Sequence, residues 1–234
     1  MLTIENLTKK YGDKTVLKNL SLNINAGEIY GFIGHNGAGK TTTIKCVAGI
    51  LAFDEGVIKV DGVSVSDNPM EVKRKIAYIP DNPDIYNYMS GLQYLNFIAD
   101  VFGISEADRK AKIETLAADF ELSADLPRKI SEYSHGMKQK LVMISAFLHD
   151  PKLIILDEPF VGLDPKAAFL LKGKMREFCK DGGAIFFSTH VLDVAEKLCD
   201  RVAIIKNGEL IKCGTMEEVK GDSSLESVFL ELEK

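Results

Sequence analysis

The residues with the clearest chemistry form one glycine-rich run, Gly34-His35-Asn36-Gly37-Ala38-Gly39-Lys40-Thr41. Its glycines allow a tight loop whose backbone N–H groups converge on one anion. At this spacing the Lys40 ammonium can reach the β- and γ-phosphates of a nucleotide, and the Thr41 hydroxyl can hold Mg²⁺. We expect this phosphate loop to bind a nucleoside triphosphate, rather than to be an ordinary glycine-rich turn. The candidate binding residues are Asn36, Gly37, Gly39, Lys40, Thr41 and Thr42, the last through its hydroxyl or its backbone N–H.

The flanks of the phosphate loop fit the same interpretation. The apolar run 28–33 is typical of a buried strand, and apolar residues then recur at helical spacing up to Leu51. A helix that begins at Lys40 would turn the positive end of its dipole toward bound phosphates. The sequence therefore predicts the strand, loop and helix order that a phosphate site requires.

A pair of carboxylates follows a second apolar run. Residues 153–156 are apolar and are followed by Asp157 and Glu158. A carboxylate at the tip of a buried strand can hold Mg²⁺ beside a triphosphate, and we assign this role to Asp157. A neighbouring carboxylate can orient and deprotonate an attacking water, and we assign this role to Glu158. Alone the pair would be a common strand end, but with the upstream phosphate loop it predicts Mg²⁺ binding and hydrolysis of a nucleoside triphosphate.

Composition narrows the possible partners. The chain has 234 residues and a net charge of −5, which argues against a nucleic-acid partner. The first residues contain no basic segment and no apolar signal core, so we expect no signal sequence, and no apolar run approaches the roughly 18 residues that a membrane span needs. The four cysteines form no C-x-x-C pair, and we expect all four to be small buried residues in a reducing compartment. The chain itself is expected to be cytoplasmic.

The elements that position these residues follow from periodicity. Alternation over residues 2–26 predicts antiparallel strands, and Asp61-Gly62 between apolar runs predicts a hairpin with a type I′ turn. After a short strand at 76–79, the pattern becomes helical. Ser90 and Gln93 form a capping box, and helical spacing continues over 106–120 and 135–148.

Strands and helices then alternate to near the C-terminus. Strands are expected at 153–156, 184–188 and 202–205, with helices at 165–179 and 191–199, which indicates a parallel sheet. We therefore expect an α/β fold in one domain, 1–234, with an antiparallel β subdomain in its N-terminal part. The catalytic core would comprise about 1–81 and 151–215, the helical subdomain about 82–150, and a helical tail 216–234.

Four further motifs occur in a recognisable order. The segment Tyr133-Ser134-His135-Gly136-Met137-Lys138-Gln139 lies between the phosphate loop and Asp157, and Gly162-Leu163-Asp164-Pro165 and Ser188-Thr189-His190 follow. Tyr11 precedes them all. From residue 2 to about 215 this order resembles an ATP-binding cassette (ABC) nucleotide-binding domain. The resemblance implies a P-loop NTPase fold with a RecA-like parallel core.

The resemblance also implies roles for these motifs. Tyr11 would stack on adenine, His190 would be the switch histidine at the γ-phosphate, and Asp164 would belong to the D-loop. Ser134 and Gly136 would contact the ATP of a second cassette. The segment 133–139 lies where the family carries its signature motif. Because this chain has one phosphate loop and one signature, a working unit would need a second ABC ATPase chain, identical or different. The expected catalytic residues are Lys40, Ser134, Glu158 and His190, with ATP and Mg²⁺ as cofactors.

Function follows from the same resemblance. We expect an ATP-hydrolysing subunit that powers a separate integral membrane permease and lies at the cytoplasmic face of the membrane. Residues 85–95 resemble an exporter-like group, so export is favoured over import. The cargo is not encoded here. The rival interpretations are a soluble ABC ATPase of DNA repair, chromosome organisation or translation, and a small-molecule kinase. The acidic charge argues against the first, and a kinase would leave Ser134, Asp164 and His190 unexplained.

Two positions depart from the family pattern. Asp81 stands where the family has Gln, and it can only accept hydrogen bonds, although it could still hold the metal or a metal-bound water. In the signature, His135 replaces Gly and Met137 replaces Gln. Either His135 adds a pH-sensitive contact in a closed dimer, or the substitution is harmless.

Overall fold

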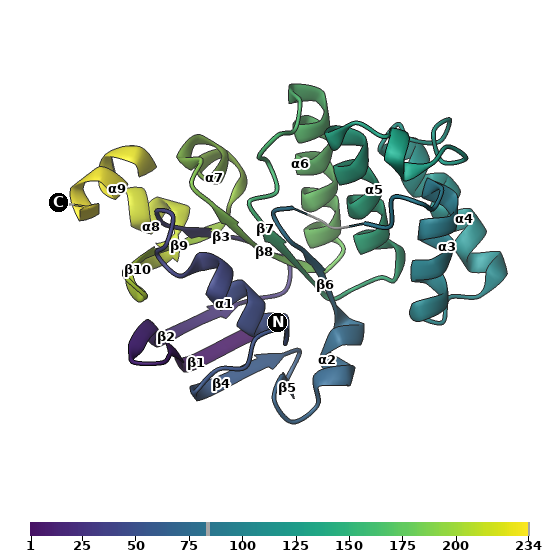
Figure 1. Cartoon of the computed structure of the whole chain (residues 1–234). Coiled ribbons are helices and arrows are strands. Elements are labelled where there is room, and N and C mark those ends of the chain that lie inside the picture. Colours follow the sequence, from purple (N-terminus) through teal and green to yellow (C-terminus); the bar gives the residue numbers. More distant parts are fainter. Residues whose placement is uncertain (83–84, 234) are drawn as a thin grey trace.

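A six-stranded sheet forms the centre of the computed structural model, which describes residues 1–82 and 85–233 (Figure 1). Its strand order is β10-β9-β3-β8-β7-β6, and the central pairs are parallel while β9 and β10 are antiparallel. The strands are β3 (Ile29–Ile33), β6 (Ile76–Ile79), β7 (Leu153–Asp157), β8 (Ala184–Thr189), β9 (Arg201–Lys206) and β10 (Glu209–Thr215). The parallel α/β core expected from the sequence is confirmed.

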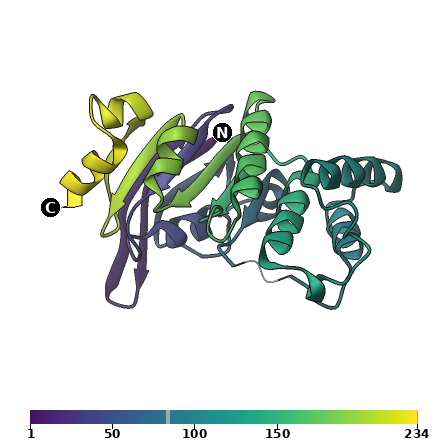
Figure 2. The same ribbon diagram turned by 90° about the horizontal axis from the view of Figure 1, so that it is seen from above.

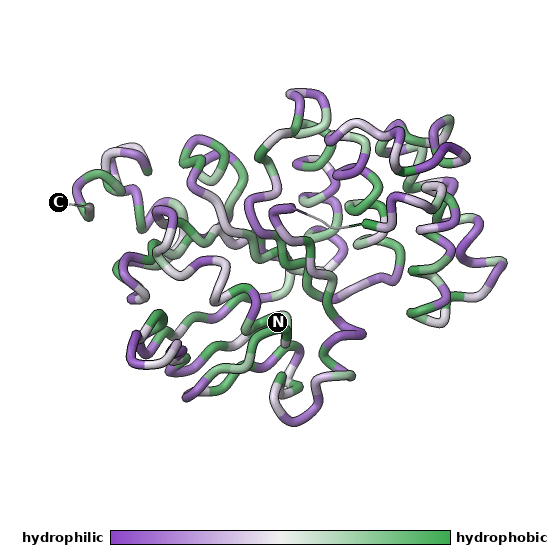
Figure 3. Tube along the Cα trace, viewed as in Figure 1, coloured by the Kyte–Doolittle hydropathy of each residue, from purple (hydrophilic) through white to green (hydrophobic). Residues whose placement is uncertain are grey.

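The central strands are buried on both faces, so they carry continuous apolar runs rather than alternating ones. Successive side chains still point to opposite faces. In β8, Ile185 and Phe187 join the core that the larger helices cover, while Ala184 and Phe186 join the core on the other side. Figure 3 shows the resulting hydrophobic band along these strands.

The second sheet is antiparallel, with the order β2-β1-β4-β5. Its strands are β1 (Leu2–Tyr11), β2 (Lys14–Ile24), β4 (Glu55–Val60) and β5 (Val63–Ser64). Asp61 and Gly62 join β4 to β5 with φ of 50° and 78°, as a type I′ turn requires. The predicted hairpin is therefore confirmed, and this sheet packs with α1 (Lys40–Val47) against the six-stranded sheet.

One helix was missing from the sequence prediction. The helix α2 (Pro69–Lys75) joins the antiparallel sheet to β6. It is short and buries only Val72, so it has little apolar periodicity. The available signal was Pro69 at the first helical turn, a position that favours proline because no backbone N–H is needed there.

Most of the remaining helices lie beyond the β6 edge or cover one face of the sheet. They are α3 (Gly91–Val101), α4 (Glu106–Asp119), a 3₁₀ turn at Ile130–Glu132, α5 (His135–Leu148), α6 (Pro165–Lys180) and α7 (Leu192–Leu198). The capping box of Ser90 and Gln93 is present at α3, as predicted. The expected boundary of the helical subdomain includes residues 83 and 84, which lie outside the described residues, and the domain limits stay a prediction.

The C-terminal part forms two helices, α8 (Met216–Lys220) and α9 (Leu225–Glu233), while residue 234 lies outside the described residues. Figure 2 shows that α9 and the helices α3 and α4 lie at opposite ends of the molecule. The backbone N–H of Leu225 donates to Glu196 Oε2 at 2.9 Å, and Lys206 Nζ donates to the Leu232 carbonyl at 2.9 Å. Both ends of α9 are therefore tied to the core.

The cysteine prediction is correct for three residues and wrong for one. Cys46, Cys179 and Cys199 are buried free thiols, whereas Cys213 is exposed. Cys213 lies on β10, the edge strand, where alternate side chains face solvent. Within residues 1–82 and 85–233, no helix has the length and apolar character needed to cross a bilayer.

Candidate functional site

The predicted catalytic motifs meet at one edge of the six-stranded sheet. Because β3, β7 and β8 are parallel neighbours, their carboxyl ends lie side by side. The phosphate loop follows β3, and His190 follows β8. Asp157 is the last residue of β7, and Glu158 comes directly after it. The crevice at the carboxyl ends of parallel strands is where open α/β folds bind ligands.

The phosphate loop has the backbone of an anion cradle. Gly39 has φ of 114°, and a Cβ there would lie 2.7 Å from Leu17 Cδ2. The positive φ would strain any other residue at Gly39, and a side chain there would also require the buried Leu17 side chain to shift. The helix α1 begins at the next residue, so its free N–H groups and positive dipole end face the loop. The loop geometry fits binding of a phosphate chain.

Lys40 is buried and points back into the phosphate loop. Its Nζ donates to the Gly34 carbonyl at 2.7 Å and to the His35 carbonyl at 3.3 Å. The same Nζ lies 3.4 Å from Glu158 Oε1. The lysine charge is thus held at the centre of the loop, beside the proposed catalytic carboxylate.

Glu158 connects the phosphate loop to the predicted switch histidine. Its Oε2 lies 3.0 Å from His190 Nδ1 and accepts from the His190 backbone N–H at 3.3 Å. Its Oε1 is buried and accepts no hydrogen bond from the described residues. The 3.4 Å contact of Oε1 with Lys40 Nζ is an ion pair and does not have hydrogen-bond geometry. A buried carboxylate oxygen left in this way is suited to accept a hydrogen bond from water.

Asp157 lies deeper in the same site. It is buried, and its Oδ1 accepts from the Ser188 hydroxyl at 2.5 Å. The Asp157 carboxylate and the Thr41 hydroxyl could both supply oxygen ligands, the kind of ligand that Mg²⁺ prefers. Within the described part of the chain, no group of three or more His, Cys, Asp or Glu side chains is arranged as a metal cluster.

Asp81 lies within electrostatic reach of this site. Burial raises the pKa of the Tyr78 hydroxyl to about 12, and the negative charges of Asp157 and Asp81 both add to the rise. The two carboxylates therefore act on the same buried tyrosine. Tyr78 Oη is buried with no hydrogen-bond partner in residues 1–82 and 85–233. The structure leaves the metal role of Asp81 as a prediction.

Four predicted residues lie apart from the Lys40 and Glu158 cluster. Ser134 caps α5 by accepting from the Met137 N–H at 3.3 Å, and Gly136 follows in the first turn. Asp164 caps α6 by accepting from the backbone N–H groups of its first turn. Tyr11 is half-exposed at the end of β1, with Lys9 Nζ 5.2 Å from its ring centroid. The Ser134 hydroxyl therefore stands at a helix N-terminus, which suits an anion.

The signature segment contacts the loop after Glu158, a contact that no local sequence pattern indicated. A Cβ at Gly162 would lie 2.9 Å from His135 Nε2, so the imidazole packs directly on this glycine. In the next turn of α5, Gln139 Nε2 donates to the Val161 carbonyl at 3.1 Å. The unusual His135 is thus in contact with the segment that precedes Asp164, within one chain.

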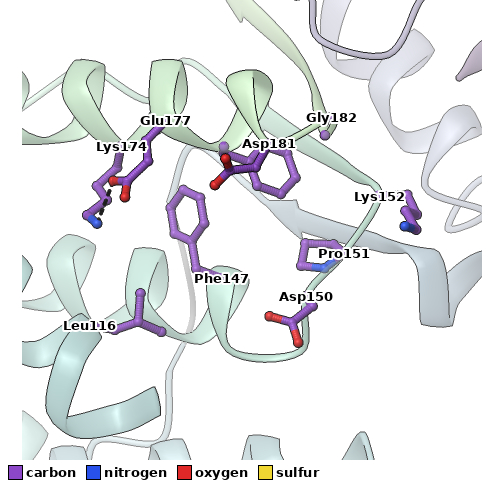
Figure 4. Close-up of a pocket in the computed structure, with 11 residues that line it drawn as sticks. Leu116, Phe147, Asp150, Pro151, Lys152, Lys174, Glu177, Asp181 and Gly182 are labelled. Carbon is purple, nitrogen blue, oxygen red and sulfur yellow. Dashed lines mark hydrogen bonds and ion pairs between the residues drawn. The ribbon is translucent and has the colours of Figure 1, made fainter. Parts of the chain in front are cut away.

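A separate cavity of about 340 Å³ lies at the opposite end of the sheet (Figure 4). Residues just before β7 and β8, including Pro151, Lys152, Gly182 and Gly183, line it. Because the strands are parallel, these residues are at the far edge from the phosphate loop. None of the predicted nucleotide-site residues lines this cavity.

The family model, the similar sequences and the solved structures give one consistent result. A family model described as ABC transporter matches residues 17–161. The ABC-type transporter ATP-binding protein EcsA of Bacillus subtilis (strain 168) is 36% identical over 239 residues, which cover 100% of this chain and 97% of that protein. The linearmycin resistance ATP-binding protein LnrL of the same organism is 32% identical over 219 residues, covering 94% of this chain and 70% of that protein.

The fold also closely matches that of a solved structure. A protein described as an ATP binding subunit of an ABC transporter superposes with a TM-score of 0.95 and 36% identity. The match covers 100% of both chains. Sequence and structure comparisons therefore point to one family.

Proposed function

The chain belongs to the ABC transporter family as an ATP-binding, ATP-hydrolysing subunit, and from that membership we propose that it drives an export permease through a two-cassette cycle. The observation that carries this proposal is the cluster of Lys40, Glu158 and His190 at the carboxyl ends of the parallel strands. These side chains come from three segments and converge on one point, as in-line phosphoryl transfer requires.

The hydrolytic step assigns a task to each side chain. A water oxygen bonds to the γ-phosphorus, the bond from that phosphorus to the bridging oxygen breaks, and ADP leaves with the electron pair. Glu158 takes the proton of the water. Lys40 stabilises the charge on the phosphoryl oxygens, and His190, held against Glu158 Oε2 at 3.0 Å, contacts the γ-phosphate. When bound through Asp157 and Thr41, Mg²⁺ would neutralise charge on the phosphates.

A second cassette would complete the site. Ser134 and Gly136 open the helix α5 rather than joining the cluster around Lys40. We propose that they contact the γ-phosphate held by a second ABC ATPase chain, identical or different. Two ATP molecules would then lie in the interface, and hydrolysis would separate the chains.

An exposed aromatic cluster supports the permease partner. Tyr86, Tyr88 and Phe97 lie where residues 85–90 enter α3, with ring centroids 5.8 Å apart for Tyr86 and Tyr88 and 5.7 Å for Tyr86 and Phe97. Tyr88 is 72% exposed and Phe97 38% exposed. Aromatic side chains exposed together are typical of a protein interface. We propose that this aromatic cluster contacts a membrane permease and holds the cassette at the cytoplasmic face of the membrane.

Export is the proposed direction. The observation that favours it is the similarity to LnrL, whose name assigns it to linearmycin resistance. Residues 85–95 also resemble exporter-like cassettes. We do not infer a cargo, because cargo is read by the permease.

Partner capture tests this proposal. The tagged chain is expressed in its own cell, membranes are extracted with mild detergent, and co-purifying proteins are identified. We expect a polytopic membrane protein whose fold is that of an exporter. The double variant Tyr88→Ser, Phe97→Ser should lose this partner while the ATPase activity of the isolated subunit is kept.

The matched control is Phe169→Ser, which removes an exposed aromatic ring from α6. It should retain the permease. Capture of a soluble or ribosomal partner, with no membrane protein, would mean that the cassette does not serve transport. An importer fold would overturn only the direction.

A further inference from the structure

We propose that Ser188 is a positioning residue for ATP hydrolysis, because one hydroxyl fixes both the metal-binding Asp157 and the backbone of the catalytic Glu158. The role rests on the proposed functions of these two carboxylates. Ser188 itself would not touch the nucleotide. Its effect would pass through the residues that do.

The register of two parallel strands brings the three residues together. Asp157, at the end of β7, lies directly opposite Ser188 in β8. Side chains alternate along both strands, so Asp157 and Ser188 point to the face shared with Phe186, the side on which α1 packs. Ser188 is 0% exposed, which removes competition from solvent for its hydroxyl.

The Ser188 hydroxyl is used in two directions at once. Its O–H donates to Asp157 Oδ1 at 2.5 Å, and its oxygen accepts from the Glu158 backbone N–H at 3.0 Å. A hydroxyl can do both, whereas a methyl group can do neither. The bond to a carboxylate is also the stronger kind, because the acceptor is charged. One side chain therefore locks the Asp157 rotamer and the start of the following loop together.

The backbone of Glu158 needs such support. Its φ is 50°, in the left-handed region that non-glycine residues rarely occupy. This conformation turns the chain sharply after β7 and directs the Glu158 side chain to Lys40 and His190. The hydrogen bond from the Glu158 N–H to Ser188 is formed at this turn. Without it, the carboxylate that activates water would be less well fixed.

The test separates metal binding from turnover. Affinity for the non-hydrolysable analogue AMP-PNP is measured with and without Mg²⁺ in the wild type, and the ratio defines the Mg²⁺ enhancement. In Ser188→Ala we expect this enhancement to fall roughly 10-fold, as loss of a hydrogen bond to a charged group predicts. Affinity without Mg²⁺ should stay within about 2-fold, because the phosphate loop is intact. The kcat for ATP should also fall roughly 10-fold, with a smaller change in KM.

Three further variants make the result specific. Ser188→Thr keeps the hydroxyl and should retain most of the Mg²⁺ enhancement and most of the kcat. Ser188→Cys keeps a small side chain with weak hydrogen bonding, so it should lose them as Ser188→Ala does, and it serves if the alanine variant does not fold. Ser145→Ala removes another buried hydroxyl, which donates to the Val142 carbonyl in α5, and should change neither.

Asp157→Asn distinguishes the two levels of the proposal. If Asp157→Asn abolishes the Mg²⁺ enhancement but Ser188→Ala and Ser188→Cys keep it, the role of Ser188 is overturned and the metal site stands. If Asp157→Asn also keeps the enhancement, the metal role of Asp157 fails and the inference about Ser188 fails with it. Equal losses in Ser188→Ala and Ser188→Thr would likewise overturn the role of the hydroxyl.

Discussion

Lys40 Nζ lies 3.4 Å from Glu158 Oε1, and the two side chains are only 6% and 13% exposed. This contact joins the phosphate loop after β3 to the end of β7, although the two residues are far apart in sequence. Opposite charges at such burial interact more strongly than at the surface. Bound phosphates would compete for Lys40, so nucleotide binding would change the partners of Glu158 directly.

The first prediction concerns Glu158 as the base. In Glu158→Gln, the side chain keeps its size but loses the proton acceptor, so turnover should fall at least about 100-fold. Nucleotide binding should persist, because the phosphate loop is unchanged. Single-turnover hydrolysis and equilibrium binding of ATP measure the two quantities. The surface variant Glu5→Gln is the control, and near-normal turnover in Glu158→Gln would refute the assigned base.

The second prediction concerns Lys40. Lys40→Ala removes the charge at the centre of the loop, and ATP affinity should fall roughly 10- to 100-fold, as expected for lost charge-assisted hydrogen bonds. Turnover should be lost as well. Calorimetric titration with ATP measures the affinity. Lys45→Ala, which removes an exposed lysine from the same helix, should bind ATP normally.

The third prediction concerns support of the phosphate loop by the C-terminal helix. The ring of Phe229 in α9 meets the ring of His35 edge-on, with centroids 4.9 Å apart. Phe229 is 6% exposed, so Phe229→Ala should lower the free energy of unfolding by about 3 kcal/mol. We also expect weaker ATP binding well below the melting temperature, because the loop loses a neighbour.

Its matched control is the next residue in the same helix. Leu230 is 57% exposed, and Leu230→Ala should change the free energy of unfolding by no more than about 0.5 kcal/mol. Urea unfolding and ATP titration of both variants give the comparison. Unchanged ATP affinity in a folded Phe229→Ala protein would show that α9 contributes to stability alone.

The fourth prediction concerns pH and His149. Burial lowers the pKa of His149 below its ordinary value of 6.5, although the Ile76 carbonyl opposes the shift. The unfolded chain then binds the proton more readily than the folded one. Stability from the neutral imidazole is therefore present above about pH 6.5 and is lost as pH falls through the folded pKa.

His149→Gln should reduce this loss. The free energy of unfolding in urea is measured at pH 7.5 and pH 5.5 for both proteins. Between these pH values, the free energy of unfolding should fall more in the wild type than in the variant. The difference between the two falls should not exceed about 1.4 kcal/mol for each pH unit. An equal loss in the two proteins would exclude His149 as a source of acid sensitivity.

Local signals in the sequence were sufficient for most elements. The capping box at Ser90, the turn at Asp61 and Gly62, and the buried runs of β3, β7 and β8 all depend on residues close in the chain. Such signals depend on local backbone preferences and side-chain periodicity, so these elements can be predicted from the sequence without knowledge of the tertiary structure. The short helix α2 was not predicted, because Val72 is its only buried residue and one apolar position gives no helical periodicity.

The motif order in the sequence determined the family, and it named Lys40, Asp157, Glu158 and His190 as candidates. Only the tertiary structure decided what each of them touches. The bridge from Ser188 to Asp157, the packing of Phe229 on His35 and the contact of His135 with Gly162 all join distant segments. These contacts depend on strand register and helix docking, which are set by burial of the whole core rather than by any local run of residues.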